Sequence, residues 1–197
     1  MLWGGFLTGR GSITAQTVYN VNGVISAGEL TNVGALTING DYVQTSHGDM
    51  VVNVQRHRNT ITNDFLLVNG AASLDGDVFV VPVNAQSLPR WNDVYTVLNA
   101  DAVVGNFDDV NLVTVGPSLY GDSIVRANGN VDVVVKARPL GGWFGAGHRL
   151  HSLGEAIDVL RWGGHYNGFT NLFTLVDTAS YATFDNTLFG LTPTNSF

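Results

Sequence analysis

Three groups of side chains in this sequence have residue types that occur in functional sites. His148, His151 and Glu155 lie at i, i+3 and i+7, so they would share one face of a helix. Imidazole and carboxylate groups on one face can bind a transition metal. The opposite face is apolar, with leucine and isoleucine at 150, 153, 157 and 160. We therefore favour the simpler interpretation of an amphipathic helix with a solvated polar face.

A second group is Gly121-Asp122-Ser123-Ile124, which resembles the Gly-Asp-Ser-Leu block of one esterase family. In that family a late Asp-x-x-His supplies the base, because a serine hydroxyl is inert without one. The sequence contains no Asp-x-x-His. We interpret the block as a turn between two strands.

A third group is formed by the aspartate pairs Asp75/Asp77 and Asp108/Asp109, whose oxygens could bind Ca²⁺. Neither pair completes a calcium loop, and turn-capping aspartates are the better interpretation. His47, His57 and His165 are scattered along the chain. The sequence therefore predicts no catalytic residue, no cofactor-binding residue and no metal site.

The composition is that of a turn-rich β protein. Of 197 residues, 45% are hydrophobic, only 13% are charged and 24 are glycine, which is far from a disordered composition. The net charge of −7 argues against a nucleic-acid partner, since such partners require clustered Lys and Arg. Cysteine is absent, which excludes disulfides, thiolate zinc sites and a cysteine nucleophile, and suits secretion into an oxidising compartment.

The architecture is indicated by two similar sequence segments, which we call phrases: residues 36–42 (LTINGDY) and 66–72 (LLVNGAA). Their offset of about 30 residues is on the scale of stacked repeat folds. Apolar and polar residues alternate at 36–38 and again at 50–54, as in a strand with one buried face. These features predict stacked β-structure.

Further strands are predicted at 17–20, 24–26, 78–83, 94–98, 112–115 and 131–135, with a polar loop at 55–59. Asn-Gly pairs occur at 22, 39, 69 and 128. Asn-Gly fits the tight hairpin turns of an antiparallel sandwich and also the corners of a β-helix. The turn residues alone leave both architectures open.

The character of the chain changes at the Pro/Gly-rich segment 138–142, which we interpret as a boundary. Beyond it, apolar periodicity predicts helices at 150–160, at 169–176 and from Tyr181 to Phe189, the last ended by Gly190 and Pro193. The predicted organisation is a β stem at 1–137 and a helical C-terminal appendage at 138–197.

The order of motifs resembles the membrane-proximal end of autotransporter passenger domains from Gram-negative bacteria. The similarity spans roughly residues 30–190 and rests on three successive phrases. The matching positions are Gly34, Leu36, Ile38, Asn39, Gly40 and Tyr42; then Asp64, Leu66, Val68, Gly70, Ala72, Leu74 and Gly76; then Tyr95, Val97, Leu98, Ala100, Gly105 and Phe107. The helical tail resembles the linker between such a passenger and its barrel.

This resemblance implies a right-handed parallel β-helix that is secreted to the surface of a Gram-negative bacterium. It also implies that the last turns form a folding nucleus and that the precursor carries an outer-membrane barrel. The chain departs from the family in one large way, because no barrel follows the helical tail.

We therefore expect a structural or adhesin-type β-helix module, a stem that meets further copies of itself, neighbouring domains of a longer precursor, or a cell-surface polysaccharide. Self-assembly into fibres or a sheath would use the stacked β edges and the helical tail. The alternatives are a carbohydrate-active or esterase-like hydrolase on the same scaffold and an antiparallel β-sandwich adhesin.

Overall fold

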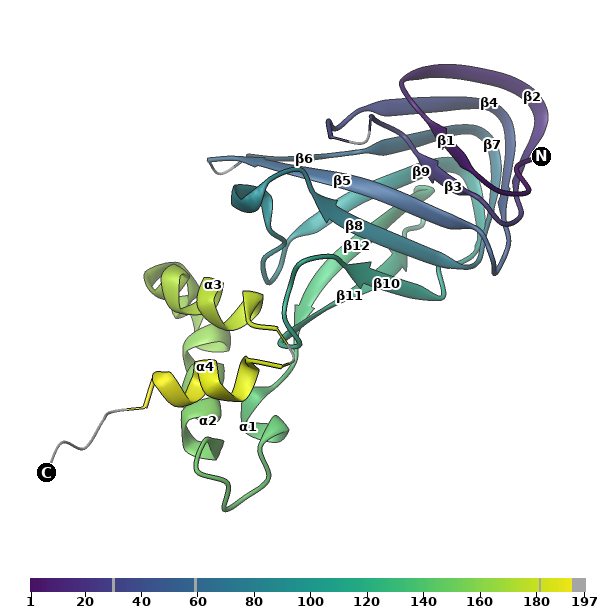
Figure 1. The fold of residues 1–197 in the computed structure, drawn as a ribbon. Helices are drawn as coiled ribbons and strands as arrows, with labels where there is room; N and C mark the ends of the chain where they lie inside the picture. Colours follow the sequence, from purple (N-terminus) through teal and green to yellow (C-terminus); the bar gives the residue numbers. More distant parts are fainter. Residues whose placement is uncertain (30, 59, 181, 193–197) are drawn as a thin grey trace, which may run out of the picture. The chain divides into compact units, whose positions relative to one another are not determined.

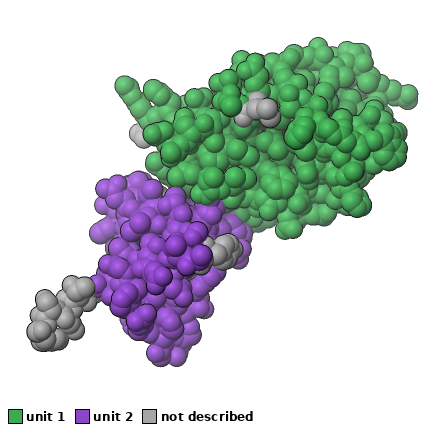
Figure 2. Space-filling view, in the orientation of Figure 1, with its two compact units in different colours: residues 1–114, 121–135 green, residues 115–120, 136–197 purple. Residues whose placement is uncertain are grey.

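The computed structural model describes residues 1–29, 31–58, 60–180 and 182–192 (Figure 1). The chain divides into two compact units, which Figure 2 distinguishes by colour. Residues 1–114 and 121–135 form the first, which we call the solenoid unit, and residues 115–120 and 136–197 the second, the helical unit. The second unit thus takes in a short segment, 115–120, that sequence reasoning assigned to the stem.

The solenoid unit is built from two sheets of mainly parallel strands. The first sheet has the order β11 (Leu119–Val125), β12 (Asn130–Ala137), β9 (Val94–Gly105), β7 (Phe65–Leu74), β4 (Ala35–Gln44) and β2 (Gly11–Asn20). The second has the order β1 (Phe6–Thr8), β3 (Val24–Ser26), β5 (Asp49–His57), β8 (Asp77–Pro82) and β10 (Asp109–Leu112), with β6 (Thr60–Asn63) beside β5.

One long strand of the first sheet and one strand of the second make each turn, and about four turns stack. The predicted parallel β-helix is therefore confirmed, and the antiparallel sandwich alternative is wrong. β5 pairs antiparallel with β6, and β12 pairs antiparallel with β9.

The stacking register follows the repeated phrases. Gly11 lies opposite Leu36, Leu36 opposite Leu66, and Leu66 opposite Leu98, so successive turns are offset by 25, 30 and 32 residues. Leu36, Leu66 and Leu98 are all buried. The offset of about 30 residues that joins the two phrases is thus the length of one turn.

Alternating apolar residues fill the interior between the two sheets. Ile38 and Val68 are in register in the first sheet, and Met50 and Val78 in the second, and all four are at most 3% exposed. Burial of such side chains supplies about 1.5–3 kcal/mol each. The strands with period-2 alternation are those whose inner face forms this core.

Asn39-Gly40 and Asn69-Gly70 do not form hairpin turns, because they lie inside β4 and β7, where the strands bend. Gly40 has a φ of 140°, and a Cβ there would lie 1.8 Å from the carbonyl oxygen of Ala15. Only glycine permits this close approach of neighbouring turns. By contrast, Asn128-Gly129 does form the turn that joins β11 to β12.

The predicted polar loop at 55–59 is wrong for residues 55–57, which are strand, whereas Arg58 lies in a turn. β5 continues to His57 and pairs antiparallel with β6, while Asn59 lies outside the described residues. Within the solenoid unit, the backbone N–H of Arg56 donates a hydrogen bond to Ser87 Oγ at 3.0 Å. Ser87 itself belongs to a short 3-10 helix, η1 (Ala85–Ser87).

The helical unit contains four α-helices among the described residues: α1 (Leu140–Trp143), α2 (His151–Leu160), α3 (Thr170–Thr178) and α4 (Phe184–Gly190). Between α2 and α3 lie two short helical turns, η2 (Arg161–His165) and η3 (Tyr166–Phe169). The core of this unit is apolar and consists of Leu140, Phe144, Leu150, Ile157, Phe173, Val176, Ala179, Phe184 and Leu188.

The predicted helices at 150–160 and 169–176 are confirmed by α2 and α3, and the third is confirmed by α4 from Phe184 on. Tyr181 and Pro193, which were part of that prediction, lie outside the described residues. Sequence reasoning missed α1, because its Gly141 and Gly142 are typical of a hinge rather than a helix. Gly141 has to be small, since a Cβ there would lie 2.7 Å from Cγ of Glu155.

Candidate functional site

The histidines expected on one helix face have a structural role. α2 begins at His151, so His148 lies before the helix, where its ring stacks on Phe144 with centroids 4.9 Å apart. His151 Nδ1 lies 2.9 Å and 2.8 Å from the carbonyl oxygens of Gly141 and Phe144. Since carbonyls only accept, Nδ1 carries the proton and donates to both.

The hydrogen bond to the Phe144 carbonyl raises the pKa of His151, with burial opposing it. Glu155 completes the contact, with Oε1 at 3.4 Å from Nε2 of His151. Among the described residues, no group of three or more His, Cys, Asp or Glu side chains is arranged to hold a metal ion. His151 therefore joins α2 to the end of α1.

Ser123 lies in a strand and not in the predicted turn. It belongs to β11, is 8% exposed, and its carbonyl oxygen accepts a hydrogen bond from Asn106 Nδ2 at 3.0 Å. No histidine hydrogen-bonds to its hydroxyl in the part of the chain that the structure describes. The serine–base contact of a nucleophilic site is thus missing here.

The aspartates of the third group do converge, at one corner of the solenoid unit. The Gly76 N–H lies 2.9 Å from Oδ1 of Asp75 and 3.3 Å from Oδ2 of Asp108, one turn further on. A hydrogen bond between the two carboxyl groups raises the pKa of Asp108, with smaller contributions from burial and from the charge of Asp75. Asp77 and Asp109 are in register beside them. The carboxylates cap a turn, as the sequence indicates.

Sequence reasoning missed a buried carboxylate in the middle of the solenoid unit, that of Asp64, which is 1% exposed. Its Oδ1 accepts from the Gly34 N–H at 2.8 Å. Its Oδ2 accepts from the backbone and side-chain nitrogens of Asn53, both at 3.0 Å, and from Ser26 Oγ at 3.2 Å. Asp64 therefore connects three successive turns.

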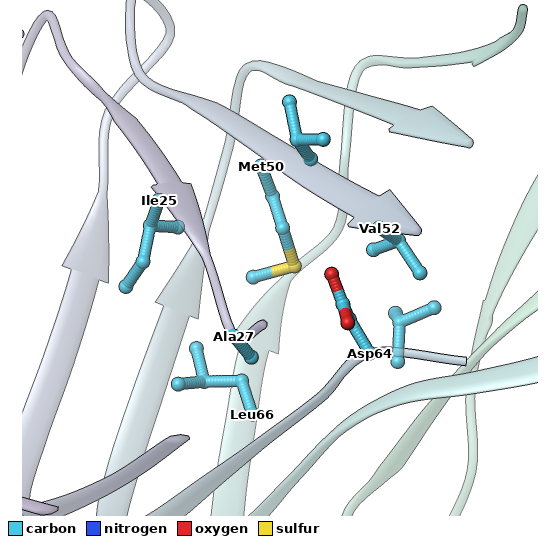
Figure 3. A pocket seen from close by; sticks show the side chains of 8 residues that line it. Ile25, Ala27, Met50, Val52, Asp64 and Leu66 are labelled. Atoms are coloured by element: carbon cyan, nitrogen blue, oxygen red, sulfur yellow. The ribbon is translucent and has the colours of Figure 1, made fainter. Parts of the chain in front are cut away.

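Figure 3 shows this carboxylate pointing into an apolar space lined by Ile25, Met50, Val52 and Leu66. The space has no room for a water molecule, so it is not a ligand pocket. Burial raises the pKa of Asp64, and the four donated hydrogen bonds oppose that rise. A charge here is tolerated because four hydrogen bonds are donated to the carboxylate.

The helical unit contains a buried ion pair between Arg161 and Asp177, with Nη2 and Oδ1 2.6 Å apart. Ser118 Oγ donates to the same oxygen at 2.6 Å, and the Gly116 N–H donates to the Asp177 carbonyl. The Arg161 guanidinium lies over the Phe173 ring, 4.8 Å from its centroid. These contacts explain why residues 115–120 belong to the helical unit.

The N-terminal end of the solenoid unit has open strand edges. Among the described residues, β1 pairs with β3 alone, and β2 pairs along its length with β4. Leu2 covers only the end of β2, through hydrogen bonds with Tyr19 and Val21 of 2.7 Å and 2.9 Å. In the part of the chain that the structure describes, the outer edge of β2 from Gly11 to Val18 therefore has no neighbouring strand.

Large apolar side chains are exposed in the N-terminal segment of the solenoid unit. Met1, Trp3 and Phe6 are 71%, 69% and 72% exposed. Residues 1–28 contain a single charged side chain, Arg10, whose Nη2 donates to the Val33 carbonyl at 2.8 Å. β1 and β2 carry no Lys, Pro or charged side chain that would protect an edge, although β1 is only three residues long and β2 has a register shift between Thr14 and Thr17. This open N-terminal end is the strongest candidate for a functional surface.

The sequence contains a signal for this surface that sequence reasoning did not use. Residues 1–15 gave no prediction because glycine interrupts their apolar pattern. The combination of exposed aromatics with 28 nearly uncharged residues is the feature that could have indicated it.

Comparison of the chain with protein-family models, with curated proteins and with solved structures found no match. No described helix is long and apolar enough to cross a membrane.

We predict that Asp64→Asn destabilises the solenoid unit by about 1–3 kcal/mol, because an amide nitrogen would face donors from Asn53 and Ser26. Urea denaturation followed by circular dichroism measures the effect. Asp41→Asn is the matched control, because Asp41 is exposed and its amide can still accept from the Ala71 N–H. Equal midpoints for both variants would show that the buried carboxylate does not hold the turns together.

We also predict that Asp75→Asn lowers the pKa of Asp108, because it removes the neighbouring carboxyl that raises it. Since the folded-state pKa is raised, the pair costs stability at neutral pH, and stability is regained as pH falls through that pKa. Carbon-detected NMR titration of the Asp108 carboxyl tests this. Asp109→Asn should leave the pKa raised, and an unchanged pKa in Asp75→Asn would refute the assignment.

Proposed function

We propose that this protein is a non-catalytic structural module, the β-solenoid stem of a secreted surface protein, which self-associates through its open N-terminal end. The observations that carry the proposal are the unpaired edge of β2 and the exposure of Trp3 and Phe6 in the same N-terminal part of the solenoid unit. A strand edge without protective charges is a template for another strand.

The repetitive hydrogen bonding of the solenoid supports this proposal. Each turn satisfies its backbone groups through the turns on either side, so stability propagates from neighbour to neighbour. At the N-terminal end this ladder stops at β1 and β2. A partner that supplies strand edges would continue the interactions that hold the turns together.

The helical unit also exposes large apolar side chains. Six of them are 41–68% exposed: Trp143, Val159, Trp162, Phe169, Leu175 and Phe189. Assembly into fibres or a sheath would use some of these side chains in a second contact.

Placement at the cell surface of a Gram-negative bacterium rests on the resemblance to autotransporter passengers, and with it the outer-membrane barrel of a precursor and contacts with surface polysaccharide. The positions that carry the resemblance coincide with structural requirements of the solenoid: Ile38 and Leu66 are core, Asp64 joins the turns, and Gly40 and Gly76 have positive φ. The absence of cysteine agrees with an oxidising compartment.

Light scattering over a range of concentrations, together with negative-stain electron microscopy, tests the proposal. We expect concentration-dependent association that Phe6→Lys reduces at least tenfold, because a charge would be buried at the contact. Val104→Lys is the matched control, since Val104 is 68% exposed in β9, away from the open end. A monomer at every concentration, or equal effects of both variants, would refute self-association through this end.

A further inference from the structure

We infer that the partner of the open N-terminal end is the same end of a second copy, arranged around a two-fold axis with the two β2 strands antiparallel. This inference rests on the proposed function and specifies its partner. It is carried by the geometry of β2, by the distribution of exposed apolar side chains, and by charge.

The geometry of β2 suits a self-complementary contact. The pairing of β2 with β4 shifts register between Thr14 and Thr17. The part before this shift, Gly11–Thr14, pairs with β4 on its inner edge, and its outer edge has no partner strand among the described residues. A two-fold axis brings a strand edge against its own copy, and the two strands then run antiparallel. The free N–H and C=O groups of one β2 edge then face the C=O and N–H groups of the same edge in the second copy.

The exposed apolar side chains favour contact through the N-terminal end of the solenoid unit over contact through the other end. Its three most exposed large hydrophobic side chains are Met1, Trp3 and Phe6. At the other end, the edge strands β10 and β11 expose one such side chain, Val125, at 37%. Aromatic side chains bury about 150–250 Å² each. The area buried by Trp3 and Phe6 of both copies, together with the strand edges, approaches the ~1,000 Å² expected of a specific interface.

Charge favours the same arrangement over a head-to-tail stack. Contact with the other end would bring the exposed carboxylates of Asp108 and Asp109 under a second copy. Burying unpaired carboxylates is costly. The N-terminal end carries only Arg10, whose guanidinium is already bound to a backbone carbonyl of its own chain.

An isologous contact closes on itself and yields a dimer. A longer polymer then requires a different second contact, for which the exposed side chains of the helical unit remain. The two-fold arrangement thus makes the dimer the unit of any larger assembly.

Cysteine cross-linking tests the arrangement directly, because the chain has no cysteine of its own. Ser12→Cys and Thr14→Cys place thiols at exposed positions of the free edge, and Asp109→Cys places one at the start of β10. Cα atoms across an antiparallel pair lie about 4.5–5.5 Å apart, within reach of a disulfide. Each variant is oxidised alone and in mixtures with the others, at a concentration where light scattering detects the dimer.

The two-fold arrangement predicts a disulfide dimer from Ser12→Cys alone, from Thr14→Cys alone, or from their mixture. It also predicts that Asp109→Cys cross-links with neither. Adding Phe6→Lys to the variant that cross-links should reduce the yield at least tenfold, whereas adding Val104→Lys should not.

A cross-link between Ser12→Cys or Thr14→Cys and Asp109→Cys would show a head-to-tail stack and overturn the inference. Association without any cross-link from the β2 positions would also overturn it, while leaving self-association intact. A chain that stays monomeric throughout would overturn both the inference and the proposed function, so the two failures are distinguishable.

Discussion

The structure of this protein depends on one constraint: the backbone of each turn of the solenoid is satisfied only by the turns next to it. In-register pairing of Leu36, Leu66 and Leu98 stacks identical faces, so the apolar interior is continuous from turn to turn. Gly40 allows adjacent turns to approach at the corner where a side chain could not fit. Among the described residues, the same constraint leaves the outer edges of β1 and β2 without a paired strand.

Several buried polar residues serve this stacking. Asp64 hydrogen-bonds to residues of two other turns from inside the core, and Gln44 Nε2 donates to the Asp75 carbonyl of the following turn at 2.8 Å. In the helical unit, His151 and the Arg161–Asp177 pair hold segments together in the same way.

Much of the fold could be predicted from the sequence, because its signals are local. Alternation in β4 and the 30-residue offset to β7 follow directly from a one-sided buried strand and a fixed turn length. Glycines at tight corners, such as Gly40, could also be predicted from the sequence, although their position after Asn is equally typical of hairpin turns.

The rest depended on contacts between residues far apart in the chain. The polar segment ending at His57 continues as a strand because distant groups satisfy its polar atoms, as Ser87 does for the Arg56 N–H. The buried role of Asp64 likewise requires donors from Ser26 and Asn53 that no local pattern reveals. The exposure of Trp3 and Phe6 becomes meaningful only when β2 is seen to lack an outer neighbour.

Amide hydrogen exchange over a range of protein concentrations is the most direct test of the central idea, that the fold is completed by association at its open end. We expect amides of residues 11–18 to become protected as concentration rises, while those of the turn at Asn128-Gly129 exchange at an unchanged rate. Exchange in β2 that does not depend on concentration would contradict the account, because the edge would then remain open to water at every concentration.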